Sequence, residues 1–156
     1  MAETHEIEAA RVRAVAVAMT ALVDVRDWSG VERFFAPQVR VDYSSLFPGE
    51  AEMLAREALV ARWRALVPGF DATRHRLGDV AIEVTGNEAT GTANVAGTHW
   101  LDGRSWTVTG RYDYAFRKVD GAWRISALTY LSEREEGDRG LVDLAAARAA
   151  EQQNER

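Results

Sequence analysis

The chain has 156 residues, of which 47% are hydrophobic and 28% are charged, values that are ordinary for a single globular domain. Its formal net charge of −5 and its lack of a basic patch argue against nucleic-acid binding. The absence of cysteine excludes disulfides, thiolate zinc sites and cysteine nucleophiles.

The first helix is predicted over residues 6–25. The apolar run of residues 14–23 follows two arginines and superficially resembles a signal peptide. Three glutamates among the first eight residues make the leading region acidic, whereas a signal peptide needs positive charge there, and the run is too short to span a bilayer. We therefore expect a cytoplasmic chain whose first helix is heavily buried. Its apolar residues recur at helical spacing, at Ile7, Ala10, Ala14, Val15, Ala18 and Leu22.

A short helical turn is predicted next, over residues 31–35, and Pro37 is expected to end it. Residues 39–43 alternate between apolar and polar side chains, with Tyr43 on the apolar face, and this pattern predicts a strand. A second long helix is predicted over residues 52–67, closed by a Pro-Gly pair.

Strands dominate the rest of the chain. They are predicted over residues 73–77, 80–84, 89–101, 106–118 and 123–131, before a charged break over 133–140 and a final helix over 141–151. This order indicates an α+β fold in which a curved antiparallel sheet wraps around the N-terminal helices as a cone. Glycines 91, 97 and 110 allow the strands to bend. Such a cone encloses a cavity suited to a small molecule.

Two histidines are predicted to face this cavity. His75 lies between two arginines on its strand, so strand alternation places the arginines outside and His75 inside. His99 shares a face with Val95 and Gly97 by the same parity. A buried imidazole needs partners, and Asp24 is a candidate because a carboxylate is disfavoured at a helix C-terminus unless it is paired. An Asp–His pair would fix one tautomer and leave the other ring nitrogen as a base.

Other interpretations of these residues remain open. His75 could be a core histidine bonded to a backbone carbonyl. Tyr43 and Tyr112 could be core aromatics, or their hydroxyls could polarise a substrate carbonyl. Asp24, His75 and His99 are a plausible ligand set for a metal but show no diagnostic spacing, so neither a metal nor a cofactor is expected.

Several motifs occur in a characteristic order. They are Leu22–Trp28 with Asp24, Val41–Ser45 with Tyr43, Thr73–Gly78 with His75, then His99, and an Asp-Gly-Ala-Trp hairpin within Val119–Arg124. On these motifs the chain resembles the scytalone dehydratase-like branch of the SnoaL-like proteins, in the nuclear transport factor 2-like superfamily. The resemblance spans about residues 7–135, within one domain expected over 1–156.

The resemblance implies a cone-shaped α+β barrel, often a homodimer through its outer sheet face, and a cofactor-independent lyase, isomerase or cyclase. It implies that Asp24 and His75 form the catalytic pair and that His99 is the second pocket histidine. Related dehydrochlorinases use a similar pair. The chain departs from the family at three substrate-binding positions: Val23 replaces a tyrosine, Gly110 a serine and Tyr112 an asparagine. The departures favour a substrate other than the naphthol of the fungal dehydratases.

The leading hypothesis is an enzyme that removes a proton next to a carbonyl or a leaving group on a small cyclic substrate, with polyketide-derived rings among the candidates. His75 would be the base, His99 the acid, and Tyr43, helped by Tyr112, the hydrogen-bond donor to the carbonyl. Cyclisation is less favoured, because no inward acid matches that of the polyketide cyclases. The alternatives are a dehydrohalogenase-like lyase, a small-ligand-binding module without catalysis, and a dimeric structural domain without a site.

Overall fold

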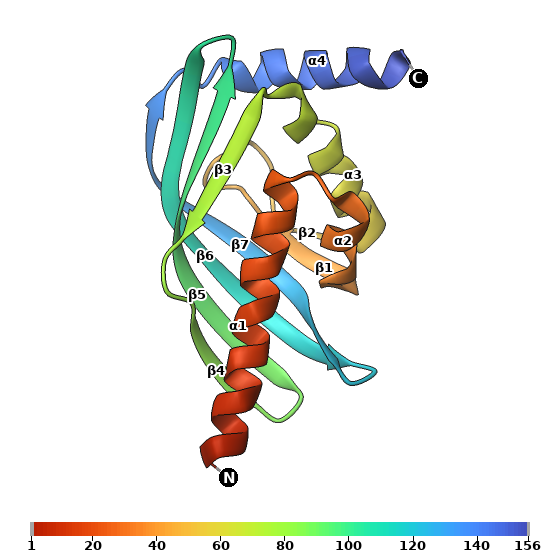
Figure 1. Ribbon diagram of the computed structural model, residues 1–156, viewed down its shortest axis with the longest axis vertical. Helices are drawn as coiled ribbons and strands as arrows, with labels where there is room; N and C mark the ends of the chain where they lie inside the picture. The colour runs from red at the N-terminus through yellow and green to blue at the C-terminus, as the bar shows by residue number, and fades with distance from the viewer. Residues whose placement is uncertain (1, 156) are drawn as a thin grey trace.

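A curved sheet with helix α1 against its concave side forms the body of the molecule (Figure 1). The computed structural model describes residues 2–155. The helices are α1 (Ala2–Asp24), α2 (Trp28–Arg33), α3 (Arg56–Arg64) and α4 (Leu141–Asn154), with a 3₁₀ turn η1 (Val67–Gly69). The strands are β1 (Phe35–Asp42), β2 (Glu52–Ala55), β3 (Ala72–Leu77), β4 (Ala81–Thr85), β5 (Glu88–Leu101), β6 (Arg104–Val119) and β7 (Ala122–Gly137).

The sheet confirms the predicted α+β class and is mixed rather than wholly antiparallel. Its order is β2-β1-β7-β6-β5-β3, and β4 pairs with β5 beside β3. All its pairs are antiparallel except β1 and β7, which run parallel. The described strands β2 and β3 end this order without pairing to each other, so the sheet stays open. Alternation within a strand does not encode the direction of its partner, which is why the parallel pair could not be predicted.

Strand β1 begins at Phe35, where a helical turn was predicted, and includes Pro37. Two further segments differ from their predicted structure because they have strand partners. The first turn of the helix predicted over residues 52–67 is strand β2, in which Leu54 pairs with Val39 of β1. The charged break predicted from Glu133 instead continues β7, whose Gly137 pairs with Trp106 of β6. In both places tertiary hydrogen bonds override the local sequence preference.

The core lies between α1 and the concave face of the sheet. One stripe of α1 is buried there, through Val12, Ala16, Met19 and Val23. Of the residues whose spacing predicted the buried stripe, only Val15 is buried, whereas Ile7 is 46% exposed and Ala10 and Ala14 are exposed as well. The helix is therefore less buried than expected. Apolar burial of this kind contributes about 25 cal/mol per Å² removed from water. None of the helices within residues 2–155 combines the length and the hydropathy needed to cross a bilayer.

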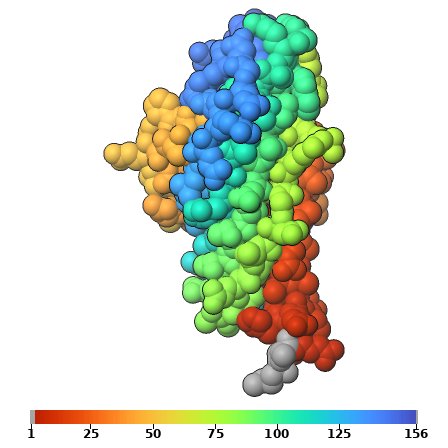
Figure 2. All heavy atoms as spheres, turned by 90° about the vertical axis from the view of Figure 1, so that its left-hand side faces the viewer, coloured from red at the N-terminus to blue at the C-terminus, as the bar shows by residue number. Residues whose placement is uncertain are grey.

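Helix α4 packs on η1 at one end of the sheet, far from the N-terminus (Figure 1). Leu141, Ala145 and Ala149 of α4 are buried, and the small alanines let the backbone of Gly69 approach closely. Figure 2 shows the outer face of the sheet, with β5, β6 and β7 side by side from green to blue and α1 at the margin. The helices and the core therefore lie on the concave side, where the cavity is found.

Candidate active site

Asp24 is the last residue of α1, and its carboxylate lies against strand β3. The helix stops at a left-handed residue, Arg26 (φ 62°), whose N–H donates to the carbonyl of Val23, while the N–H of Asp27 donates to that of Leu22. These two bonds form a Schellman motif, in which glycine is the usual left-handed residue. The Arg26 guanidinium donates to the carbonyl of Phe70 at 2.6 Å, which ties the helix end to the start of β3.

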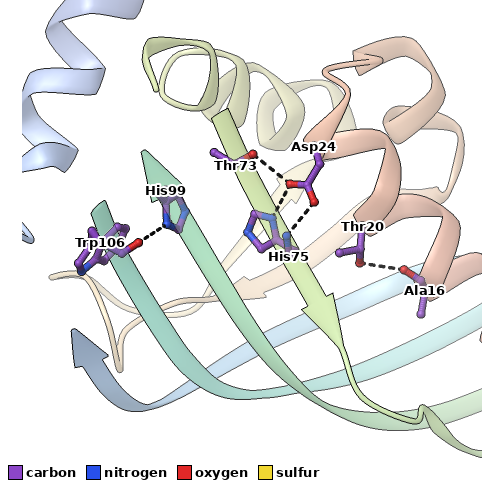
Figure 3. Close-up of polar contacts among 7 residues, drawn as sticks. All are labelled: Ala16, Thr20, Asp24, Thr73, His75, His99 and Trp106. Carbon is purple, nitrogen blue, oxygen red and sulfur yellow. Dashed lines mark hydrogen bonds and ion pairs between the residues drawn. The ribbon is translucent and has the colours of Figure 1, made fainter. Parts of the chain in front are cut away.

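The carboxylate of Asp24 and the imidazole of His75 are in direct contact (Figure 3). Thr73, His75 and Leu77 face inward on β3, as predicted, and the arginines between them are exposed. The Nδ1 of His75 lies 2.7 Å from Oδ1 of Asp24. Because a carboxylate only accepts, Nδ1 carries the hydrogen and Nε2 is left as the free ring nitrogen. Asp24 and His75 are thus joined by a hydrogen bond at Nδ1, on the side of the ring away from Nε2.

Two further groups hold Asp24 in place. The backbone N–H of His75 donates to Oδ2 at 2.7 Å, and the hydroxyl of Thr73 donates to Oδ1 at 3.0 Å. Burial alone would raise the pKa of Asp24, but the ring bond and charge of His75, its N–H and the Thr73 hydroxyl outweigh it and lower the pKa below 3.8. Asp24 is thus an anion at neutral pH, fixed by three donors.

His99 has a different environment. Its Nδ1 donates to the carbonyl of Trp106 at 3.1 Å, and its ring packs between Phe70 and Trp106, with centroids 4.9 Å and 4.7 Å away. Burial, followed by the neighbouring His75, lowers the pKa of His99 from 6.5 to about 4. His99 is therefore neutral at pH 7 with Nε2 as an acceptor, an arrangement that does not suit the acid role expected of it.

A cavity of about 510 Å³ opens in front of the two histidines. Its wall includes five of the predicted site residues, Val23, Tyr43, His75, His99 and Tyr112. Asp24 is absent from this wall because it lies behind His75. The loop after β1 contributes Phe47 to the wall, and α3 contributes Trp63. The cavity is thus a mostly apolar chamber with two imidazoles on one side.

Tyrosines form the wall at β1, β6 and β7. Tyr43 stacks on Tyr130 with ring centroids 5.8 Å apart, and Tyr112 meets Tyr130 edge-on at 5.3 Å. Burial, followed by the neighbouring Tyr112, raises the pKa of Tyr43 well above 10, and burial raises the pKa of Tyr112 as well. Both phenols therefore keep their hydrogens at neutral pH, and because the two hydroxyls also interact with each other, they can act as a pair that donates to an oxygen in the cavity.

Gly110, expected at the substrate, lies outside the cavity wall. A Cβ at this position would come within 2.2 Å of the carbonyl oxygen of Leu131 and 2.9 Å of the hydroxyl of Tyr130. Gly110 thus lets Tyr130 and β7 pack closely against β6. A glycine needed for backbone approach has the same sequence signature as one that lines a pocket, so the sequence could not distinguish the two.

Trp106 belongs to the site but was not assigned to it from the sequence. Trp106 is 2% exposed, lines the cavity and donates from Nε1 to Glu135 at 2.9 Å. Its inward parity with Tyr112 on β6 was an available signal. Gly97 also lines the cavity, opposite His75 in the register of β3 and β5. Within residues 2–155, no group of three or more His, Cys, Asp or Glu side chains is arranged to hold a metal ion.

Comparisons with known proteins give a family and a fold. A family model described as "SnoaL-like domain" matches residues 7–129, whereas no curated protein matches the chain. The Kfla4162 protein from Kribbella flavida superposes with a TM-score of 0.79 at 22% identity, over 96% of this chain and 99% of that one. A candidate scytalone dehydratase from Novosphingobium aromaticivorans gives 0.76 at 18% identity, over 89% and 93%. The hexachlorocyclohexane dehydrochlorinase LinA-type3 from Novosphingobium barchaimii gives 0.67 at 16% identity, over 84% and 90%. At these identities, the structural likeness shows the fold alone.

Proposed function

Because the chain belongs to the SnoaL-like domain family, we propose that it is an acid–base enzyme of the lyase type. It acts without a cofactor on a small cyclic substrate, removing a proton next to a carbonyl and then releasing a neighbouring hydroxyl as water. The similarity to a candidate scytalone dehydratase and to a dehydrochlorinase supports elimination as the reaction class.

One observation carries the proposal: the imidazole of His75 lines the cavity, and the Asp24 carboxylate is hydrogen-bonded to its Nδ1 from outside the cavity. The 2.7 Å contact between Asp24 and Nδ1 of His75 fixes the tautomer and leaves Nε2 as the proton acceptor. When Nε2 takes a proton, the imidazolium gains a positive charge next to the Asp24 anion, which lowers the energy of the charged state. His75 is thus the general base and Asp24 its positioning residue.

The proposed elimination proceeds through an enolate, and each proton and electron pair in it is accounted for. His75 takes the proton from the carbon next to the carbonyl, and the electron pair of that C–H bond forms an enolate. Hydrogen bonds from Tyr43 and Tyr112 stabilise the enolate oxygen. The enolate re-forms the carbonyl as a carbon–carbon double bond forms and the C–O bond of the neighbouring hydroxyl breaks. The imidazolium of His75 returns its proton to that oxygen, and water leaves.

Exchange of hydrogen for deuterium tests the first step without knowledge of the natural substrate. The purified protein is incubated in D₂O with a panel of ring ketones that includes 1-tetralone and 2-tetralone, and loss of the α-hydrogen signal is followed by ¹H NMR. We expect exchange faster than in buffer, and we expect His75→Ala and Asp24→Asn each to slow it by about 10²–10⁴-fold.

The matched control is Asp113→Asn, the same chemical change on the exposed outer face, where Asp113 pairs with Arg111. It should exchange at the wild-type rate. Wild-type exchange rates in both His75→Ala and Asp24→Asn would exclude the mechanism. Binding of the panel ketones without any exchange above buffer would instead favour a ligand-binding module.

A further inference from the structure

Two side chains of opposite charge line the cavity on the side formed by β2 and α3. Glu52 of β2 pairs with Val41 of β1, which is buried and also lines the cavity, so the two side chains share the concave face of the sheet. Arg62 of α3 follows Leu59 by one helical turn, and both line the cavity. The side chains of Glu52 and Arg62 are about half exposed, which places them where the cavity opens to solvent. We call these two residues the rim pair.

The guanidinium of Arg62 is bound by the Glu52 carboxylate through two hydrogen bonds. Nη1 of Arg62 donates to Oε2 of Glu52 at 2.5 Å, and Nη2 donates to Oε1 at 3.2 Å. This is the bidentate geometry in which an arginine recognises a carboxylate or a phosphate. The hydrogen bonds from Arg62 lower the pKa of Glu52, so Glu52 is an anion at neutral pH. The end of the guanidinium that would hold an anionic ligand is therefore already occupied by the protein itself.

The other charges around the cavity are negative. Within residues 2–155, Arg62 is the only lysine or arginine on the cavity wall. Glu50 adds a second carboxylate to this wall, and the Asp24 anion lies just behind it. His99 is neutral at pH 7, because burial lowers its pKa to about 4. An anionic ligand would thus meet carboxylates and find the one guanidinium already paired.

We propose that Glu52 is a specificity-determining residue that withholds Arg62 from anionic ligands, so that the cavity accepts uncharged ring compounds and rejects the corresponding carboxylates. The proposal rests on the proposed function only in taking the selected ligand to be the substrate. The discrimination comes from a penalty on the wrong ligand, since an entering carboxylate must either displace Glu52 from Arg62 or stay unpaired beside two glutamates. Because the rim pair is half exposed, we expect a several-fold effect.

The test uses two probes that share a ring and nearly the same shape but differ in charge, 2-naphthamide and 2-naphthoate. Their dissociation constants are measured by NMR titration at pH 8 and low salt. We expect the wild-type protein to bind 2-naphthamide at least about tenfold more tightly than 2-naphthoate. Added salt should narrow this difference, because it screens charges near solvent.

Glu52→Gln should strengthen the binding of 2-naphthoate by about three- to tenfold, because it releases the Arg62 guanidinium. Binding of 2-naphthamide should stay within about twofold of the wild-type value, since this probe carries no charge. Glu50→Gln is the matched control, since it removes the same charge from the same wall and leaves the rim pair intact. It should strengthen 2-naphthoate binding by less than about twofold. The double variant Glu52→Gln/Arg62→Gln should lose the gain of the single variant.

Four results would overturn the proposal. They are a wild-type protein that binds neither probe at millimolar concentration or binds both equally, an unchanged affinity of Glu52→Gln for 2-naphthoate, an equal gain in Glu50→Gln, and a gain that persists without Arg62. An unchanged affinity in Glu52→Gln would mean that the rim pair only ties α3 to β2. These outcomes are separate from those of the deuterium exchange. Exchange that depends on His75, together with any of the four, would remove the role of Glu52 and keep the enzyme. A charge preference set by the rim pair without exchange would do the reverse.

Discussion

Asp24 is the residue on which the site depends, because three donors converge on its two oxygens. Thr73 supplies the one donor of these three that does not come from His75, and its hydroxyl lies 3.0 Å from Oδ1. It does not face the substrate side of His75, so it acts through the carboxylate. Its bond stabilises the charged form of Asp24, since a hydrogen bond to an anion lowers the pKa.

Thr73→Val should raise the pKa of Asp24, because it removes one donor from the anion and preserves the shape of the side chain. The acidic limb of the pH–rate profile for deuterium exchange, which reports protonation of the coupled Asp24–His75 pair, should therefore move to higher pH. The expected loss of rate at pH 7 is about tenfold or less, the effect of one hydrogen bond to a charged group. Thr98→Val is the control, since the Thr98 hydroxyl bonds to that of Thr107 and neither residue lines the cavity. An unshifted limb in Thr73→Val would contradict this role.

At the scale of elements, α4 and η1 support the histidine side of the cavity. Phe70, the residue after η1, packs on the ring of His99, and Val67 of η1 lines the cavity. Helix α4 lies beyond the segment that matches the family, residues 7–129, yet it is the element packed against η1. The contact allows no side chain at Gly69, whose Cβ would lie 1.8 Å from the carbonyl oxygen of Ala145.

Gly69→Ala should therefore push α4 away from η1. The expected destabilisation is about 1–3 kcal/mol, which corresponds to a fall in Tm of roughly 2–12 °C for a chain of this size. Gly78→Ala is the matched control, because its Cβ would meet atoms only at 3.6 Å and 3.7 Å. Differential scanning calorimetry compares the two variants. Equal Tm values for both would show that α4 can shift without cost.

At the scale of the whole molecule, burial of the site makes stability depend on pH. The pKa of His99 is about 4 in the folded protein, against the ordinary histidine value of 6.5 that applies to the unfolded chain. Between these values the unfolded chain binds a proton that the folded protein does not, so unfolding becomes easier as the pH falls. Asp24, whose pKa is lowered in the folded state, adds a loss of stability only at more acidic pH, below about 3.8.

The His99 contribution to the free energy of unfolding should be fully present above pH 6.5 and should decline by about 3 kcal/mol on approaching pH 4, at roughly 1.4 kcal/mol per pKa unit. His99→Gln removes the titrating group and keeps an amide that can donate to the Trp106 carbonyl. Urea unfolding at pH 7, 5.5 and 4 should show a shallower decline for His99→Gln than for the wild type. His5→Gln, on the exposed face of α1, should decline like the wild type. If the free energy of unfolding fell equally with pH in all three proteins, the pH dependence could not be assigned to His99.

The sequence by itself determined the element types over most of the chain and the faces of the principal strands, because alternation and helical spacing are local and repeat within a few residues. That is why Thr73, His75 and Leu77 could be assigned to the inner face. The order of the motifs along the chain indicated the SnoaL-like family, and the family match over residues 7–129 confirms it.

Only the tertiary structure decided what depends on partners distant in sequence. It made a strand of residues 52–55, paired β1 in parallel with β7, placed Gly110 against Tyr130 and surrounded His99 with aromatic rings that keep it neutral. Strand pairing, close packing and desolvation arise from contacts between segments that the chain brings together only on folding, so no local pattern records them.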